Sequence, residues 1–207
     1  MLRLFTANLL RGRADPAALA DQLAGLGVDV ACFQELGVRQ AEAIARVLPH
    51  GKLDPSAVGA PDYHGMGIAA RRPLDVHHLP LPDRDARVAR LSPADWPGLG
   101  LPLEVVNVHV QAPHTFAQWR ALALRRAQTS GLCAHLDATP RLRRVVAGDF
   151  NATPLWPVYR ALAARLSDSR PSGAMHCTAV APVPMIATRL SPSRSIGVPS
   201  GSPPVYA

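Results

Sequence analysis

Residues 144–151 read Arg-Val-Val-Ala-Gly-Asp-Phe-Asn, an apolar run that ends in a carboxylate and a carboxamide. The paired valines are typical of a buried strand. Asp149 and Asn151 are two residues apart, so on an extended segment they point to the same side. Asp149 can orient or deprotonate a water molecule, and Asn151 can bind a metal ion or a phosphate oxygen. The same pair can equally form a turn before a helix near Leu155, and this stretch alone does not separate the two interpretations.

Three other apolar runs also end in polar side chains. The first ends at Asn8, the second at Gln34 and Glu35, and the third contains Asn107 and His109. Each has a structural interpretation, such as a solvated strand-end charge for Glu35 or a hydrogen-bonded core histidine for His109. An α/β protein, however, holds its functional side chains at strand ends, where a rigid sheet positions them. Together, two carboxylates, carboxamides and an imidazole predict a site for a metal ion and a phosphate group.

Strand-like and helix-like stretches alternate along residues 1–168. The apolar runs predict strands over residues 2–10, 28–36, 64–72, 74–81, 87–91, 103–110 and 144–150. Helical spacing and start signals predict helices over residues 16–26, 38–48, 115–136 and 155–166. Because the alternation is mixed with hairpin-like pairs, the pattern favours a layered α/β fold with mixed sheets.

The composition changes after Asp168. Residues 169–207 contain no Asp, Glu, Phe or Trp and are rich in Pro and Ser. Such a segment cannot bury enough apolar area to offset the entropy of ordering it. We therefore expect one domain over residues 1–168 and a degenerate or disordered tail over residues 169–207, which a protease would cut before the domain.

The formal net charge is +7 at pH 7, which favours polyanionic partners such as nucleic acid. Lys52 is the only lysine, and the abundance of Arg, Ala, Pro and Gly equally indicates a GC-rich coding bias that raises the charge without a selected partner. Arg120, Arg125 and Arg126 on one predicted helix could contact DNA, but the simpler interpretation is that they form its solvated face. Charge alone therefore does not identify the substrate.

Several classes of protein are disfavoured by what the sequence lacks. No apolar run is long enough to span a membrane, and the first residues do not have the regions of a signal peptide. Cys32, Cys133 and Cys177 are too widely spaced for a metal clip and too few for a disulfide framework. No Gly-x-Ser-x-Gly, P-loop or His-Glu-x-x-His motif occurs. We expect a cytoplasmic protein, with a monomer favoured.

Taken in order, the four motifs resemble those of the endonuclease/exonuclease/phosphatase superfamily, which includes deoxyribonuclease I and exonuclease III-type enzymes. The resemblance consists of an Asn after the first strand, Gln-Glu after the second, an Asn-x-His strand and then Gly-Asp-Phe-Asn. Residues 65–73 also look like the family segment with a conserved pattern of Gly, Arg and Pro. The resemblance implies an α/β fold of the deoxyribonuclease I type, a two-sheet mixed β-sandwich flanked by helices.

The resemblance also implies a reaction, the metal-dependent hydrolysis of a phosphoester by direct attack of water. The cofactor would be Mg²⁺ or Mn²⁺, and the substrate would be nucleic acid or a small phosphoester. Carried over to this sequence, Glu35 binds the metal ion and Asn8 assists it. Asp149 positions or activates the water, and Asn151 and His109 hold the scissile phosphate.

The sequence departs from the family pattern near its C-terminus. Family members end with a Thr-Trp segment, an Arg-Ile/Leu-Asp strand and an Asp-His pair. Here no acidic residue follows Asp168, and His176 is the only histidine after position 135. We therefore expect a fold that is incomplete at the C-terminus, with this region lost by truncation or frameshift. Two functions stay open: a hydrolase impaired by the loss of the Asp-His pair, or an inactive relic that retains metal or polyanion binding.

Overall fold

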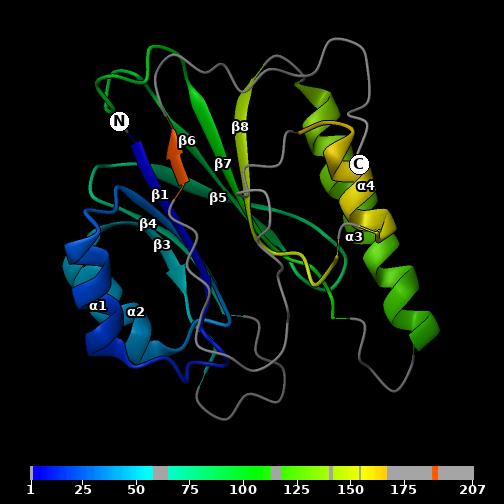
Figure 1. Cartoon of the computed structure of the whole chain (residues 1–207), viewed down its shortest axis with the longest axis horizontal. Helices are drawn as coiled ribbons and strands as arrows, with labels where there is room; N and C mark the ends of the chain where they lie inside the picture. Colours follow the sequence, from blue (N-terminus) through cyan, green and yellow to red (C-terminus); the bar gives the residue numbers. More distant parts are fainter. Residues whose placement is uncertain are drawn as a thin grey trace.

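The computed structural model describes residues 2–57, 65–112, 118–139, 142–153, 155–166 and 188–190. In these residues two β-sheets pack face to face, and a pair of helices lies on the outer side of each sheet (Figure 1). Each sheet contains both parallel and antiparallel neighbours. The architecture confirms the expected two-sheet mixed β-sandwich flanked by helices.

The first sheet has the strand order β3-β4-β2-β1-β9. Its strands are β1 (Leu2–Asn8), β2 (Val30–Gln34), β3 (His50–Asp54), β4 (Met66–Ala70) and β9 (Thr188–Leu190). β1 and β2 are parallel, and the other neighbours are antiparallel. Because β1 and β2 are parallel, their last residues, Asn8 and Gln34, are paired in the register and lie side by side.

The second sheet has the strand order β5-β6-β7-β8. Its strands are β5 (Asp75–Leu79), β6 (Ala86–Leu91), β7 (Leu103–His109) and β8 (Arg143–Asp149). Only β7 and β8 are parallel within this sheet, and their last residues, His109 and Asp149, are paired in the register. Each sheet therefore contains one parallel pair whose C-terminal ends carry polar side chains.

The helices are α1 (Pro16–Gly25), α2 (Val38–Val47), α3 (Gln118–Ala138) and α4 (Pro157–Ala163). In Figure 1, α1 and α2 lie on one side of the strands, and α3 and α4 lie on the other. α1 begins as the sequence predicts, because the Asp15 side chain accepts a hydrogen bond from the Ala18 N–H at 2.7 Å and a proline occupies the first turn.

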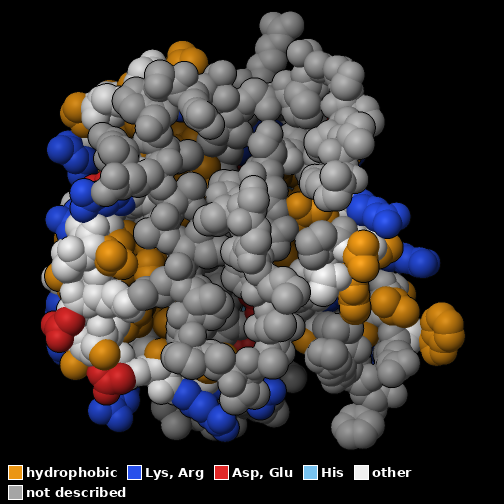
Figure 2. All heavy atoms as spheres, in the orientation of Figure 1, with side chains coloured by type: hydrophobic (Ala, Val, Ile, Leu, Met, Phe, Trp, Pro, Cys, Tyr) orange, Lys and Arg blue, Asp and Glu red, His pale blue; other side chains and the backbone are white. Residues whose placement is uncertain are grey.

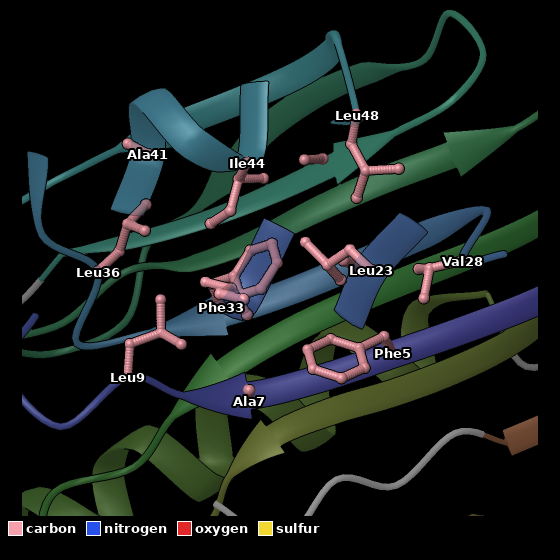
Figure 3. Close-up of a cluster of buried hydrophobic side chains, with 13 residues drawn as sticks. Phe5, Ala7, Leu9, Leu23, Val28, Phe33, Leu36, Ala41, Ile44 and Leu48 are labelled. Carbon is pink, nitrogen blue, oxygen red and sulfur yellow. The ribbon is translucent and has the colours of Figure 1, made fainter. Parts of the chain in front are cut away.

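Apolar side chains under α1 and α2 fix the first sheet to its helices. Phe5 and Phe33 project from β1 and β2, with ring centroids 6.0 Å apart, and pack against Leu23 and Ile44 (Figure 3). All four side chains are buried. Burying such aliphatic and aromatic side chains stabilises the fold by roughly 1.5–3 kcal/mol each.

The strand residues that face the space between the sheets change from apolar to polar toward one end of the sandwich. The alternation along each strand gives Leu2, Leu4, Thr6 and Asn8 on β1; Val30, Cys32 and Gln34 on β2; Leu103, Val105, Asn107 and His109 on β7; and Val145, Ala147 and Asp149 on β8. The apolar positions form the core between the sheets. The polar positions meet at the C-terminal ends of the two parallel pairs.

The structure differs from the predicted elements in three places, one of which is β9, a strand in the expected tail that was not predicted. The sequence analysis missed β3, a partly exposed strand at the edge of its sheet that contains Gly51 and has no apolar alternation. The last helix, α4, is shorter than the predicted span of residues 155–166.

The predictions about the tail fall mostly outside the described residues. Between residues 167 and 207 the structure describes only β9, which pairs with residues 2–4 of β1. Asp168, His176 and the segments expected to have lost the Asp-His pair lie outside the described residues.

Candidate active site

The site is built where the two parallel strand pairs end. Asn8 and Glu35 come from the first sheet, and His109 and Asp149 come from the second. Because the sheets pack face to face, these four side chains meet in the space between them. Four of the five residues predicted to form the site therefore lie together, although they are far apart in sequence.

Asn8 links the carboxylates of the two sheets. Its Nδ2 donates to Glu35 Oε1 at 3.2 Å and to Asp149 Oδ2 at 2.9 Å, while its Oδ1 accepts from the Leu10 N–H at 2.9 Å. Because both of these bonds come from Nδ2, the amide nitrogen of Asn8, and not its oxygen, faces both carboxylates.

Glu35 reaches this position because its backbone leaves the extended conformation. Its φ is 51°, in the left-handed region that residues other than glycine rarely adopt. Gln34 already faces the space between the sheets, so an extended Glu35 would point to the opposite face. Hydrogen bonds hold the unusual conformation: Arg11 N–H donates to Glu35 Oε2 at 2.8 Å and Gly12 N–H donates to Glu35 O at 3.0 Å. Such local strain is concentrated at functional sites in many proteins.

His109 lies near both carboxylates and a cation. Its Nε2 is 3.8 Å from Glu35 Oε1 and 3.9 Å from Asp149 Oδ2. Arg84 Nη1 lies 3.1 Å from His109 Nδ1 and 3.2 Å from His109 Nε2. The imidazole is buried, so its neighbours in the site set its orientation.

Asn151 does not follow the sequence-based expectation of an extended segment. β8 ends at Asp149, and Asn151 has a φ of 45°, so the two side chains are not related by strand alternation. Instead, Asn151 N–H donates to Asp149 Oδ1 at 2.9 Å, a local turn, and Asn151 Nδ2 donates to Val110 O at 2.9 Å. Asn151 therefore fixes the segment after His109 to the end of β8.

Gly148 allows this end of β8 to approach β7. Its φ is 132°, and a Cβ at this position would collide with the backbone of Val108. The glycine before Asp149 is thus required for the close contact between the two strands.

Two buried residues of α3 support the site, and the sequence analysis did not assign them. Gln128 Oε1 accepts from Gln111 N–H at 2.9 Å, and Arg125 Nη1 donates to Gln111 O. The interpretation of Arg125 as part of a solvated face is wrong, because the residue is only 2% exposed and its guanidinium lies 4.8 Å from the centre of the Trp156 ring. Burial lowers the pKa of Arg125, and the negative charge of nearby Asp149 raises it in part.

The donor chemistry fits a hard divalent cation. Two carboxylates held this close repel each other, and a cation between them removes the repulsion. Mg²⁺ is usually held by one or two carboxylates and keeps several waters. In the described ranges, no three or more His, Cys, Asp and Glu side chains are grouped as a metal site. Glu35 and Asp149 are the two carboxylates at this place that could hold such an ion.

Comparison with known proteins agrees with the fold and the motifs. The sequence matches the endonuclease/exonuclease/phosphatase family over residues 5–204, so the chain belongs to this family of phosphoester hydrolases. Curated protein sequences gave no significant match. No helix in the described part of the chain is long and apolar enough to cross a membrane.

Solved structures with a similar fold include three distant relatives. An endonuclease/exonuclease/phosphatase protein from Beutenbergia cavernae is 20% identical, with a TM-score of 0.63, over 81% of this chain and 55% of the other. Sphingomyelinase C from Streptomyces griseocarneus is 19% identical, with a TM-score of 0.59, over 81% of this chain and 71% of the enzyme. The human Nocturnin catalytic domain is 18% identical, with a TM-score of 0.57, over 78% of this chain and 69% of the other. At these identities the likeness concerns the fold.

Proposed function

We propose that this protein is a metal-dependent phosphodiesterase that cleaves its substrate by direct attack of water. The observation that carries the proposal is the convergence of Glu35 and Asp149, one from each sheet, on the amide of Asn8. A partly buried carboxylate pair of this kind has no evident use in packing, because two like charges close together destabilise the fold. The pair fits the divalent cation that the family resemblance implies.

Glu35 and Asp149 would hold the metal ion, with Mg²⁺ or Mn²⁺ as the candidates. When bound, such an ion polarises a phosphoryl oxygen and lowers the pKa of a bound water. Asn8 assists by holding both carboxylates in place, since its Oδ1 is already bonded to the Leu10 N–H. This role differs from that of a direct ligand and follows from the orientation of the amide.

Asp149 accepts the proton of the attacking water. The water oxygen forms a bond to phosphorus, the bond from phosphorus to the leaving oxygen breaks, and the leaving oxygen takes a proton from solvent. His109 and Asn151 hold the phosphoryl oxygens. Asn151 uses one Nδ2 hydrogen for Val110 O, which leaves the second for the substrate.

The face of the molecule in Figure 2 does not point to one class of phosphodiester. Figure 2 shows Lys and Arg side chains at separate places on one face of the molecule, not gathered into a single patch. The similar structures include a sphingomyelinase and the Nocturnin catalytic domain, which fits a fold used for different phosphoesters. Nucleic acid and small phosphodiesters both remain candidate substrates.

All the residues assigned to the site lie within residues 1–168, the proposed domain. The absence of any acidic residue after Asp168 favours a second candidate function, an inactive relic that keeps metal or polyanion binding. Loss of one preorganised group that stabilises transition-state charge typically lowers the rate about 10²–10³-fold. The two candidates therefore differ in turnover and not in metal binding.

The test is hydrolysis of bis-p-nitrophenyl phosphate with Mg²⁺, with Mn²⁺ and with EDTA, run beside nicking of a supercoiled plasmid. The proposal expects turnover that either metal stimulates and EDTA removes. Metal binding without turnover would favour the second candidate function, an inactive relic that retains metal binding. Turnover that EDTA does not affect would contradict a metal-dependent mechanism.

A further inference from the structure

The loop between β5 and β6 places a cation against His109. Arg84 follows Asp83, whose φ of 70° turns the chain at this point. The Arg84 side chain is only 15% exposed, and its Nη1 lies within hydrogen-bond distance of both ring nitrogens of His109. The guanidinium therefore sits at the candidate site and not on the open surface.

Arg84 forms an ion pair with the partly exposed Asp83, but its Nε donates no hydrogen bond among the described residues. A guanidinium has five N–H donors and no acceptor, so the ring nitrogen that it meets must be unprotonated. Arg84 Nε is buried and has no hydrogen-bond partner within the described ranges; the nearby Asp83 Oδ2 is 3.6 Å away. A buried donor without a partner costs about 1–3 kcal/mol. An anion that gives Arg84 an acceptor would remove this cost.

A single side chain of α3 holds both sides of the Arg84–His109 contact. Gln128 Nε2 donates to Pro82 O at 2.9 Å, two residues before Arg84. Gln128 Oε1 accepts from Gln111 N–H at 2.9 Å, two residues after His109. Gln128 is 2% exposed, so these bonds are shielded from water. The loop is thus fastened in the position that presents Arg84 to the site, as a preorganised binding group requires.

We infer that Arg84 is a catalytic residue that binds a non-bridging oxygen of the substrate phosphoryl group beside His109. The inference rests on the proposed function. Two carboxylates at the site repel an incoming phosphodiester, and Arg84 supplies positive charge beside His109 that offsets this repulsion. The fork of N–H groups on arginine matches phosphate oxygens, which a lysine ammonium matches less well.

If Arg84 contacts the reacting phosphate, its removal should affect all phosphodiester substrates alike. An arginine that recognises nucleic acid beyond the scissile bond would affect plasmid nicking and leave bis-p-nitrophenyl phosphate unchanged. Arg84 instead binds the group that all phosphodiesters share. Its removal lowers kcat/KM for both substrates by a similar factor, about 100-fold, as for other donors that stabilise transition-state charge.

The experiment compares the wild type with Arg84→Ala, Arg84→Lys and the control Arg39→Ala, an exposed arginine on α2. Binding of inorganic phosphate in the presence of Mg²⁺ is measured by calorimetry, and kcat/KM is measured on both substrates. Arg84→Ala should weaken phosphate binding at least tenfold, Arg84→Lys should restore it in part, and Arg39→Ala should match the wild type. Circular dichroism checks that each variant is folded. If Arg84→Ala does not fold, Arg84→Lys is compared with the wild type instead.

The outcomes separate this inference from the proposed function. Phosphate binding that depends on Arg84 in a protein without turnover would leave Arg84 as a phosphate-binding residue and would remove its catalytic role together with the hydrolase proposal. Turnover in the wild type with unchanged phosphate affinity and kcat/KM in both Arg84 variants would overturn the inference alone. A wild type that binds no phosphate would overturn it as well.

Discussion

Gln34 Nε2 donates to Asn107 Oδ1 at 2.6 Å in the interior between the two sheets. Asn107 Nδ2 in turn donates to the backbone oxygens of Phe33 and Gly67, each at 2.9 Å. One carboxamide on β7 thus holds two neighbouring strands of the opposite sheet. Because Gln34 precedes Glu35 and Asn107 lies two residues before His109, this buried pair fixes the two halves of the site relative to each other.

Asn107→Ala should destabilise the protein by about 3 kcal/mol, because it removes three buried hydrogen bonds between the sheets. Urea unfolding followed by circular dichroism measures the change. Thr6→Val is the matched control, since it removes only the longer 3.3 Å bond from Gln34 to Thr6 Oγ1. An Asn107→Ala loss no greater than that of the control would show that the Gln34–Asn107 pair does not hold the sheets together.

The sequence was enough to predict that Asn8, Glu35, His109 and Asp149 lie together, but not their conformations. Asn107 and His109 are two residues apart on one strand, and the structure places both between the sheets. The left-handed backbone of Glu35 and Asn151 leaves no mark in the side-chain pattern, because it depends on hydrogen bonds with residues distant in sequence. The same limit explains why the sequence left open whether Asp149 and Asn151 share one extended segment or form a turn.

The supporting residues were not predictable for a different reason. Arg84 lies in a loop with no periodic pattern, and only the folded chain brings it to His109. Arg125 looked like its exposed neighbour Arg126, yet it turns inward to Gln111 and Trp156. Whether an arginine on a helix is solvated or buried depends on the packing partners of that helix, and a single sequence does not supply them.

Asp149→Asn should lower metal-stimulated hydrolysis by at least about 100-fold, because an amide cannot accept the proton of the attacking water. The fold should persist, since an asparagine oxygen can still accept from the Asn151 N–H. Calorimetry with Mn²⁺ should show a smaller loss of metal affinity than for Glu35→Ala. Asp21→Asn, an exposed aspartate on α1, serves as the control. A loss of metal affinity as large as for Glu35→Ala would attribute the lower rate to lost metal and would contradict the role of Asp149 as the proton acceptor.

Glu104 should make stability fall at acidic pH. It is fully buried and accepts from Arg144 Nε at 2.6 Å and His135 Nε2 at 3.0 Å. Burial by itself raises the pKa of Glu104, but the hydrogen bonds and charges of Arg144 and His135 outweigh it and lower the pKa below its ordinary value. A lowered folded-state pKa contributes stability that is present above the unfolded pKa of about 4.3 and is lost as the pH falls through the folded-state value.

Urea unfolding of the wild type and Glu104→Gln across acidic pH measures this contribution. Glu104→Gln should be less stable near neutral pH by about 3 kcal/mol, because Arg144 then lies buried without its charge partner. Below about pH 4.3 the wild type should lose stability more steeply than the variant. Parallel pH profiles would show that Glu104 does not titrate as expected.

The most direct test of the metal site is the rate of bis-p-nitrophenyl phosphate hydrolysis as the Mg²⁺ or Mn²⁺ concentration rises, measured for the wild type, Glu35→Ala and the control Glu42→Gln, an exposed glutamate on α2. If Glu35 and Asp149 form the site around Asn8, the wild type and Glu42→Gln should show the same saturable stimulation, and folded Glu35→Ala should show none. Equal stimulation of Glu35→Ala and the wild type would contradict the proposed site.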